Sequence, residues 1–329
     1  MNAVKTDTSS IREKSYPKYQ IAWKQLRRQI YPQTFVLLGI LFLIIFSYIP
    51  MFGILMAFKD YKISTGVQGI FTSDWVGLKY FSEFVSDYRF IDLVRNTLII
   101  SVLKIIFAFP IPILFAIMLN ELKGMAFKRI VQTVSYFPHF ISWVVVSGLA
   151  FVFLSAQDGI VNMLFMKLNI VDKPLDFLTD PDMFWGLAVG SAVWKEAGWW
   201  TIIFLAAIAG INPSLYEAAQ IDGAGRLKRI WHITLPSIQG AVVVVLVLSI
   251  GSLLGGGLVG SNFEQAFLLG NSVNSDKSEI VQTYAFKVGL AEGRFAYAAA
   301  IDLVQSVLSV FLIFFSNFIA KRLSGQGLF

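Results

Sequence analysis

The chain has no cysteine, only two histidines and few charged residues, which make up 15% of its 329 residues. Without cysteine, neither a disulfide nor a thiolate metal site can form. His139 has no carboxylate or second histidine at ligand spacing, so no metal site is expected. The chain has 56% hydrophobic residues and a mean hydropathy of +0.66. This composition, with so few charged residues, excludes a water-soluble globular protein and predicts a polytopic membrane protein.

Nucleotide-binding and catalytic motifs are also missing. The chain has no G-x-x-x-x-G-K-[ST] motif and no Gly-Lys dipeptide, so it cannot hold ATP in a P-loop. Neither G-x-S-x-G nor H-E-x-x-H occurs, and no catalytic residue is predicted. Uphill transport would draw its energy from another subunit or from an ion gradient. An ion-coupled carrier normally uses several intramembrane carboxylates, and here only Glu196 and Asp302 lie within apolar stretches.

Apolar stretches long enough, or nearly so, to cross a bilayer recur along the chain; a helical crossing takes about 20 residues. We predict an all-α protein with six transmembrane helices, at Thr34–Phe58, Thr97–Leu119, Ile141–Leu154 (extensible back to Val131), Phe184–Ala209, Ala241–Val259 and Tyr297–Ile319. Six spans place both termini on one side of the membrane. The predicted organisation is an N-terminal arm, residues 1–33, followed by a transmembrane domain, residues 34–329.

The connections between these stretches differ in charge. The arm, the loops at 120–140 and 211–240 and the tail after residue 320 carry fifteen basic and five acidic residues, whereas the other three connections carry ten basic and fourteen acidic residues. By the positive-inside rule the first set, with both termini, faces the cytoplasm. The formal net charge of +6 reflects this bias and gives no reason to expect a nucleic-acid partner.

The arm has two interpretations. Tyr19, Trp23, Leu26 and Ile30 recur at helical spacing among lysines and arginines, a pattern typical of an amphipathic helix in the cytoplasmic interface. Alternatively, the arm is a basic segment that only sets the topology. A cleavable signal peptide is not expected, because 33 mostly polar residues precede the first apolar run.

The end of the fifth apolar stretch is rich in glycine, with five glycines between Gly251 and Gly260. Such a composition is poor for a helix. Two compatible interpretations remain open. Gly251 and Gly255 would allow close helix packing, or the helix breaks here and exposes its backbone to a transport path.

Residues Ile211–Pro236, the 211–236 loop, form a polar, helix-forming interruption between two apolar stretches. Asn212 can cap a helix that starts at the following proline. The glycine at Gly223 permits a sharp turn into a second segment, Arg226–His232, before the fifth span. Two short helices at an angle on the cytoplasmic side would make a knob suited to a groove in another protein.

The same loop resembles a known signature. Its three segments E-A-A, D-G-A and I-T-L-P resemble the E-A-A…D-G-A…I-T-L-P pattern of permease subunits of bacterial ABC importers of the carbohydrate type; they are Glu217-Ala218-Ala219, Asp222-Gly223-Ala224 and Ile233-Thr234-Leu235-Pro236. Three further segments resemble the branch handling oligo- and polysaccharides, such as alginate and pectin-derived chains: SYFPHFIS at Ser135–Ser142, YIPMFGILMAFKD at Tyr48–Asp60 and the ending near Gly327-Leu328-Phe329. The likeness runs from about residue 35 to the end.

This resemblance implies the type I ABC importer permease fold and a non-catalytic subunit in the bacterial cytoplasmic membrane. The implied partners are a second homologous permease subunit, an ATPase dimer and an extracytoplasmic solute-binding protein that delivers a saccharide. No cofactor is expected on this chain, since ATP and Mg would belong to the ATPase. In that family the loop docks into a cleft of the ATPase. The residues that we therefore assign to ATPase coupling are Tyr216, Glu217, Ala218, Ala219, Asp222, Gly223 and Ala224.

The transport path is predicted from polar and aromatic residues in or near the spans, because pyranose faces stack on aromatic rings and hydroxyls need hydrogen-bond partners. Lys195 and Glu196 either pair with other helices to hold the bundle or line a wet cavity. Lys104 is expected to snorkel or to pack against a polar group inside the bundle rather than to bind a ligand. The candidate path residues are Trp194, Lys195, Glu196, Trp199, Trp200, Asn262, Phe263, Gln265, Asp302 and Gln305.

The competing function is a self-sufficient ion-coupled carrier or channel, which would move its solute in liposomes without ATP. An exporter or a membrane-anchored assembly factor is disfavoured, because importers of the resembled type carry this loop signature.

Overall fold

The computed structural model describes residues 29–255 and 262–324, and every regular element within these ranges is helical. The one β pairing found in them is an isolated bridge between Lys59 and Trp75. The predicted all-α fold class is confirmed. Most of the predicted arm, the glycines after Gly255 and the ending Gly327-Leu328-Phe329 lie outside the described residues.

Contacts divide the chain into two compact units, Met1–Gly53 and Ile54–Phe329. The described part of the first unit contains α2 (Ile30–Leu43), the π-helical turn η1 (Ile44–Tyr48) and α3 (Ile49–Met51). Helix α2 is apolar around its whole circumference and has no buried residue. Such a helix suits an environment that is apolar on every side.

The second unit holds the remaining elements, which follow the 3-10 helix η2 (Phe52–Phe58). Up to the 211–236 loop these are η3 (Ile63–Thr65), α4 (Gly66–Thr72), α5 (Lys79–Val85), α6 (Phe90–Leu103), η4 (Lys104–Ala108), α7 (Pro110–Glu121), α8 (Met125–Tyr136), η5 (Phe137–Phe140), α9 (Trp143–Leu154), α10 (Ile160–Lys167) and α11 (Pro181–Ala209). The loop and the rest contain α12 (Pro213–Ile221), α13 (Arg226–Arg229), η6 (Ile230–Thr234), α14 (Leu235–Ser237), α15 (Gln239–Gly255), α16 (Asn262–Leu269), α17 (Ser275–Ser278), α18 (Val281–Leu290) and α19 (Phe295–Ser324).

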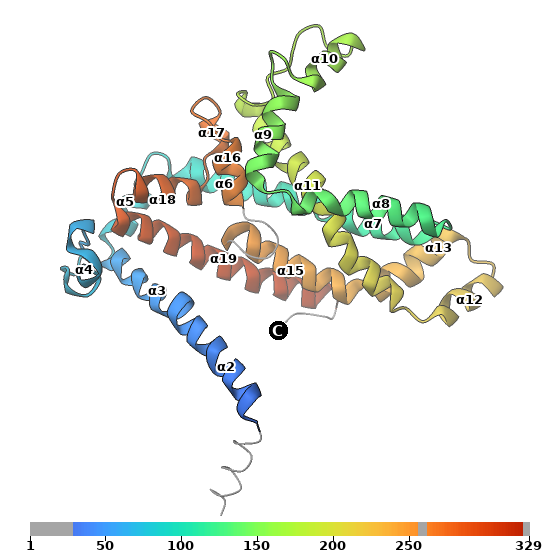
Figure 1. Cartoon of the computed structure of the whole chain (residues 1–329), viewed down its shortest axis with the longest axis horizontal. Coiled ribbons are helices and arrows are strands. Elements are labelled where there is room, and N and C mark those ends of the chain that lie inside the picture. The colour runs from blue at the N-terminus through green and yellow to red at the C-terminus, as the bar shows by residue number, and fades with distance from the viewer. Residues whose placement is uncertain (1–28, 256–261, 325–329) are drawn as a thin grey trace, which may run out of the picture. The chain divides into compact units, whose positions relative to one another are not determined.

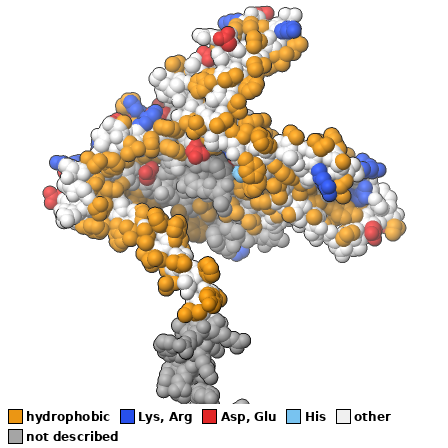
Figure 2. All heavy atoms as spheres, in the orientation of Figure 1, with side chains coloured by type: hydrophobic (Ala, Val, Ile, Leu, Met, Phe, Trp, Pro, Cys, Tyr) orange, Lys and Arg blue, Asp and Glu red, His pale blue; other side chains and the backbone are white. Residues whose placement is uncertain are grey.

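Within the second unit, Figure 1 shows α12 and α13 at one end and α5 and α18 at the other, with α15 and α19 side by side between them. Hydrophobic side chains are spread over much of the described surface in the view of Figure 2, and charged side chains are few there. An apolar surface of this kind is expected of a protein that is surrounded largely by lipid.

Within the described residues, four helices are long and apolar enough to cross a membrane: Ile30–Phe58, Phe90–Glu121, Pro181–Ala209 and Phe295–Phe318. Two bent pairs bring the number to six if each is one span: Met125–Phe140 with Trp143–Leu154, and Arg226–Ser237 with Gln239–Gly251. All six lie at the predicted stretches. The sequence did not predict the bends, which are 103° in the first pair and 60° in the second.

Prolines inside the apolar helices are accommodated by widened turns. The π-helical turns η1, η4 and η6 each end two residues before a proline, at Pro50, Pro110 and Pro236. A proline lacks the N–H donor, and its ring collides with the carbonyl of the preceding turn, so a π turn relieves the crowding there. At the second site the N–H of Phe109 bonds the carbonyl of Lys104 at 2.9 Å, and Phe90–Glu121 remains one span.

The end of the second unit opposite the 211–236 loop is held by a group that we call the tyrosine cluster: Asp87, Arg89, Glu279, Tyr284 and Tyr297. Asp87 accepts hydrogen bonds from the hydroxyls of Tyr284 at 2.6 Å and Tyr297 at 3.2 Å. It also accepts the main-chain N–H of Arg89 at 2.9 Å. The Arg89 guanidinium lies 5.5 Å from the centroid of the Tyr284 ring and 3.8 Å from Glu279. The cluster joins α18 and α19 to the start of α6.

Burial and hydrogen bonding perturb the titration of this cluster. Burial raises the pKa of the Tyr284 hydroxyl, and its hydrogen bond to Asp87 raises the pKa further. Burial also pushes the pKa of Asp87 upward, but the hydrogen bonds from Tyr284 and from the N–H of Arg89 outweigh that effect. The pKa of Asp87 therefore lies below its usual value of 3.8. The apolar residues packed around the cluster include Phe84 and Leu93, both buried.

Candidate functional site

The first helix of the 211–236 loop begins as its sequence predicts. The side chain of Asn212 accepts a hydrogen bond from the N–H of Ser214 at 3.0 Å, which satisfies a donor at the start of α12. Pro213 occupies the first helical position, where its missing donor costs nothing. Because α11 ends at Ala209, only a short connection separates the long apolar helix from this surface helix.

The turn between the two helical segments depends on Gly223, whose φ is +74°. A side chain is strained at this backbone angle, so glycine is the favoured residue here. The N–H of Ala224 bonds the carbonyl of Ala219 at 2.8 Å, and the N–H of Gly223 bonds that of Gln220 at 3.1 Å. These bonds end α12 in the manner of a left-handed C-cap, and the predicted sharp turn is confirmed.

The second segment is longer than the sequence predicts. Instead of a helix at Arg226–His232, α13 continues through the π turn η6 into α14, and the chain breaks at Ile238 rather than at Pro236. The hydroxyls of Tyr216 and Thr234 lie 2.9 Å apart, so the two segments are tied across the turn. Below them, Ile238 packs in a buried apolar cluster with residues of α7 and α11. The loop therefore has a firm base.

The predicted coupling residues lie on the outside of the loop. Four of these residues are exposed: Glu217, Ala218, Asp222 and Gly223. The other three are half-buried: Tyr216, Ala219 and Ala224. Four large apolar side chains of the same loop are also exposed: Leu215 by 49%, Ile221 by 87%, Leu227 by 73% and Trp231 by 66%. An apolar surface around a carboxylate is typical of a protein contact site.

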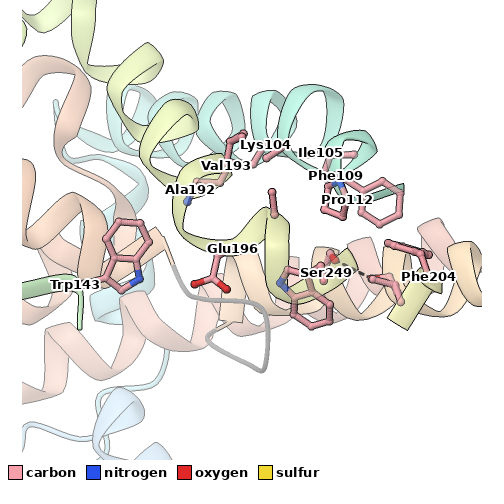
Figure 3. A pocket seen from close by; sticks show the side chains of 14 residues that line it. Lys104, Ile105, Phe109, Pro112, Trp143, Ala192, Val193, Glu196, Phe204 and Ser249 are labelled. Carbon is pink, nitrogen blue, oxygen red and sulfur yellow. Dashed lines mark hydrogen bonds between the residues drawn. The ribbon is translucent and has the colours of Figure 1, made fainter. Parts of the chain in front are cut away.

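A cavity of about 60 Å³ lies among η4, α7, α9, α11 and α15 (Figure 3). By the minimum of roughly 10–15 Å³ for each water, it holds a few water molecules and not a sugar ring. Most of its lining is apolar; the polar groups on its wall are those of Lys104, Glu196 and Ser249, together with the indoles of Trp143 and Trp200. The indole N–H of Trp200 is buried and has no hydrogen-bond partner among the described residues.

Lys195 and Glu196 fit both of the arrangements that the sequence left open. They pair with each other at 3.0 Å and bond to a neighbouring segment through His139, whose ring nitrogen lies 2.7 Å from Glu196. Glu196 also lines the cavity. Lys195 is buried and does not line it. The pair thus holds neighbouring segments together, and Glu196 alone presents its carboxylate to this mostly apolar cavity.

Lys104 packs against a polar group, which is one of its two expected arrangements. Its ammonium donates to Asn262 at 2.7 Å, and the Asn262 amide donates to Ser101 at 2.9 Å. Asn262, a predicted path residue, is 1% exposed. Its side chain therefore joins α16 to α6 and η4 and is not open to solvent.

Two other predicted path residues of α16 also serve as contacts between helices. The amide of Gln265 donates to the carbonyl of Ala188 and to the hydroxyl of Ser191, both at 2.6 Å. Phe263 meets Phe286 of α18 edge to face, with ring centroids 5.3 Å apart. These two residues therefore anchor α16 against α11 and α18.

The remaining path candidates do not converge on the cavity. Trp194 lines a separate apolar groove between α9 and α11, and Trp199 stacks on His139. Asp302 is exposed, whereas Gln305 on the same helix is buried. Of the ten candidates, Glu196 and Trp200 line the cavity.

The sequence missed His139 as a partner of Glu196, because 57 residues separate them and no local spacing joins them. It likewise missed Trp143 and Ser249 as lining residues of the cavity. The available signal was a charged pair inside one apolar stretch, which needs a polar partner from another segment. Among the described residues, no group of three histidine or acidic side chains could hold a metal ion.

Comparison with known proteins gives consistent relatives. Residues 108–325 match the family described as "Binding-protein-dependent transport system inner membrane component". The chain is 42% identical over 310 residues to Protein LplB of Bacillus subtilis (strain 168), covering 94% of each chain. It is 40% identical over 305 residues to the polygalacturonan/rhamnogalacturonan transport system permease protein YteP of the same organism, covering 93% of this chain and 92% of that one.

Solved structures agree with these relatives. A chain of a bacterial ABC transporter involved in the import of the acidic polysaccharide alginate has a TM-score of 0.82 and 36% identity, covering 92% of this chain and 99% of that chain. The bacterial alginate ABC transporter in complex with alginate pentasaccharide-bound periplasmic protein gives the same TM-score and identity, over 93% and 99%. The family match and the relatives cover most of the chain, and so this chain belongs to the binding-protein-dependent transport system inner membrane components, the multi-pass permease subunits of ABC importers.

Proposed function

We propose that this chain passes an oligo- or polysaccharide from an extracytoplasmic binding protein to the cytoplasm, driven by a separate ATPase through the 211–236 loop. The saccharide is supported by the relatives named for polygalacturonan and for alginate. The binding protein is supported by the alginate transporter that was solved with a periplasmic protein. This chain is the non-catalytic subunit, and ATP and Mg are held by the ATPase.

The observation that carries the proposal is how the 211–236 loop is held in place and which side chains it exposes. Its two helical segments are tied to each other through Tyr216 and Thr234 and are packed at their base, yet its outer side exposes Glu217 among large apolar side chains. A partner that grips this side moves the loop as one body. Because α12 follows α11 after a short connection, such a movement reaches the long helix that carries Glu196.

A second permease subunit completes the path. The first unit has an apolar helix, α2, with no buried residue, and the cavity described above is too small for a sugar ring. A second subunit would give α2 apolar neighbours and would supply the other wall of a wider path. Opening and closing of that path would then follow the movement of the loop.

The test is Glu217→Ala in the full importer, reconstituted in liposomes with its partner permease, ATPase and binding protein. We expect ATP-dependent saccharide uptake to fall about tenfold or more, as for loss of one charge-assisted hydrogen bond at an interface, while the complex still assembles. Glu121→Ala is the matched control, because Glu121 is also an exposed carboxylate on the predicted cytoplasmic side but lies outside the loop. Normal uptake and normal coupled ATPase activity in Glu217→Ala would contradict the assignment of the loop.

A further inference from the structure

Two segments of the sequence, SYFPHF at 135–140 and WKEAGWW at 194–200, meet at the bend of the third span. The Lys195 ammonium donates to the main-chain carbonyl of His139 at 2.8 Å. The same ammonium lies 5.6 Å from the centroid of the Trp143 ring. Since His139 precedes the 103° bend and Trp143 follows it, one lysine of α11 holds both sides of the bend.

Both oxygens of the Glu196 carboxylate are held at this junction. Lys195 donates to Oε1 at 3.0 Å, and the Nδ1 of His139 lies 2.7 Å from Oε2. A carboxylate can only accept, so the Nδ1–H of His139 is the donor in this pair. Charge-assisted bonds of this length are among the stronger side-chain contacts in proteins. The direction in which the carboxylate points is therefore set from two sides.

The His139 ring is itself held in place. It stacks on the indole of Trp199 with ring centroids 4.4 Å apart and an angle of 3° between the planes. Close by, α11 approaches α8 backbone to backbone: a Cβ on Gly198 would lie 1.9 Å from the carbonyl oxygen of Ser135. The close approach of α8 to α11 keeps the His139 imidazole within hydrogen-bond distance of Glu196. The imidazole does not line the cavity.

Glu196 lines the cavity, whereas His139, Lys195 and Trp199 do not. Figure 3 shows its carboxylate between the Trp143 indole and the Ser249 side chain in that view. A carboxylate has about four acceptor sites, so the two bonds from the junction leave acceptor capacity toward the cavity. A hydroxyl group donates one hydrogen bond and therefore matches this free acceptor capacity.

We propose that His139 is a positioning residue that holds the Glu196 carboxylate at the cavity wall, where Glu196 accepts hydrogen bonds from hydroxyl groups of the transported saccharide. The inference rests on the proposed function and names a recognition site within it. In the present conformation the space holds water or a single hydroxyl-bearing substituent, and the sugar ring itself passes when the path is wider. His139 acts only through Glu196 and touches no substrate.

The test is a double-mutant cycle in the full importer, with uptake of oligogalacturonate and of alginate oligosaccharide measured per assembled complex. His139→Phe keeps a flat ring for Trp199 but cannot donate to Glu196. His139→Asn keeps an amide donor near the position of Nδ1. Glu196→Gln keeps the size of the side chain and removes its charge. The fourth variant combines His139→Phe with Glu196→Gln.

We expect His139→Phe and Glu196→Gln each to lower uptake about tenfold, the loss that follows from one charge-assisted hydrogen bond. His139→Asn should stay within about threefold of the native chain, because its donor is retained. The double variant should be no more than about twofold slower than Glu196→Gln alone, since coupled residues are not additive. A merely structural histidine would instead lower uptake by the same factor in both backgrounds.

The outcomes separate this inference from the proposed function. A native complex that takes up neither saccharide contradicts the proposed function and, with it, this inference. A native complex that takes up one of them, with multiplicative losses in the double variant or with no rescue by His139→Asn, overturns the inference alone. His139→Ala is the second deletion of the donor. If neither His139→Phe nor His139→Ala assembles, the histidine is needed for folding and the inference is also overturned.

Discussion

The two ends of the second unit differ in where their polar and apolar side chains find contacts. At the tyrosine cluster, polar groups are satisfied within the chain: Asp87 takes three hydrogen bonds, from Tyr284, Tyr297 and the backbone of Arg89. At the 211–236 loop, the backbone is fixed by caps and by Gly223, but Glu217 and several large apolar side chains face outward. The first end is complete within one chain. The second exposes an apolar surface around a carboxylate, which is typical of a protein contact site.

This difference separates stability from function. Substitutions in the tyrosine cluster should lower the free energy of unfolding, because they leave buried polar groups unpaired. Substitutions on the outer side of the loop should leave that free energy nearly unchanged and affect transport, because exposed side chains contribute little to folding. The junction at His139 and Glu196 lies between the two ends and combines both properties.

The largest effect is expected for Gly223→Pro. Proline fixes φ near −65° and cannot adopt the +74° of this turn, so the outer surface of the loop would be rebuilt. A distortion of about 3 kcal/mol corresponds to a loss of uptake of roughly two orders of magnitude. Gly225→Ala is the control, since Gly225 has a φ of −65° and should tolerate a side chain. Equal uptake by Gly223→Pro and the native importer would contradict the comparison.

The next effect concerns the close contact of α11 with α8. In Gly198→Ala the new Cβ would lie 1.9 Å from the carbonyl oxygen of Ser135, so we expect a loss of about 1–3 kcal/mol in the free energy of unfolding. Gly190→Ala on the same helix meets nothing within 4 Å and should be neutral or stabilising by up to about 1 kcal/mol. Thermal unfolding in detergent measures both. Similar midpoints for the two variants would show that the helices do not touch in this way.

A smaller effect separates two tyrosines. Tyr284→Phe removes a hydroxyl of a buried tyrosine that donates to the half-buried Asp87 and should cost about 1–2 kcal/mol of the free energy of unfolding. Tyr216→Phe removes a hydroxyl that contacts Thr234 and should cost no more than about 1 kcal/mol, because the threonine hydroxyl can turn to a carbonyl of the preceding helical turn. The same thermal measurement ranks them. A larger loss for Tyr216→Phe would reverse the assignment of which end holds the fold.

The smallest effect is a pH dependence at the tyrosine cluster. The pKa of Asp87 is lowered in the folded chain, so its contribution to stability is fully present above its usual pKa and is lost as the pH falls through the folded pKa. For this partly exposed group we expect less than about 1 kcal/mol. Unfolding midpoints of the native chain and of Asp87→Asn should converge as the pH is lowered below about 4. Curves that run parallel to low pH would contradict the role of Asp87.

Local features were predictable from the sequence, and contacts between distant segments were not. The cap at Asn212 and the turn at Gly223 follow from rules that act over a few residues, so the structure confirms them. The six apolar stretches were found by composition, but the 103° bend of the third was not. Its main chain is bonded at this point by Lys195 of α11, which lies 56 residues from His139 in the sequence.

The candidate path shows the same limit. Lys195 and Glu196 were recognised as a charged pair needing partners, yet their partner His139 lies 57 residues away from Glu196. Asn262 was predicted to line the transport path and is instead buried against Lys104, 158 residues distant. A single sequence shows which groups need a partner in an apolar environment, but not which distant segment supplies it.

The most direct test of the central claim is the ATP dependence of uptake. The chain, with its partner permease, ATPase and binding protein, is reconstituted in liposomes, and uptake of oligogalacturonate and alginate oligosaccharide is compared with that of liposomes containing this chain alone. We expect uptake only by the complete importer, and only when ATP is supplied to the side that exposes the 211–236 loop. Uptake by this chain alone without ATP would contradict the claim and would identify an ion-coupled carrier or a channel.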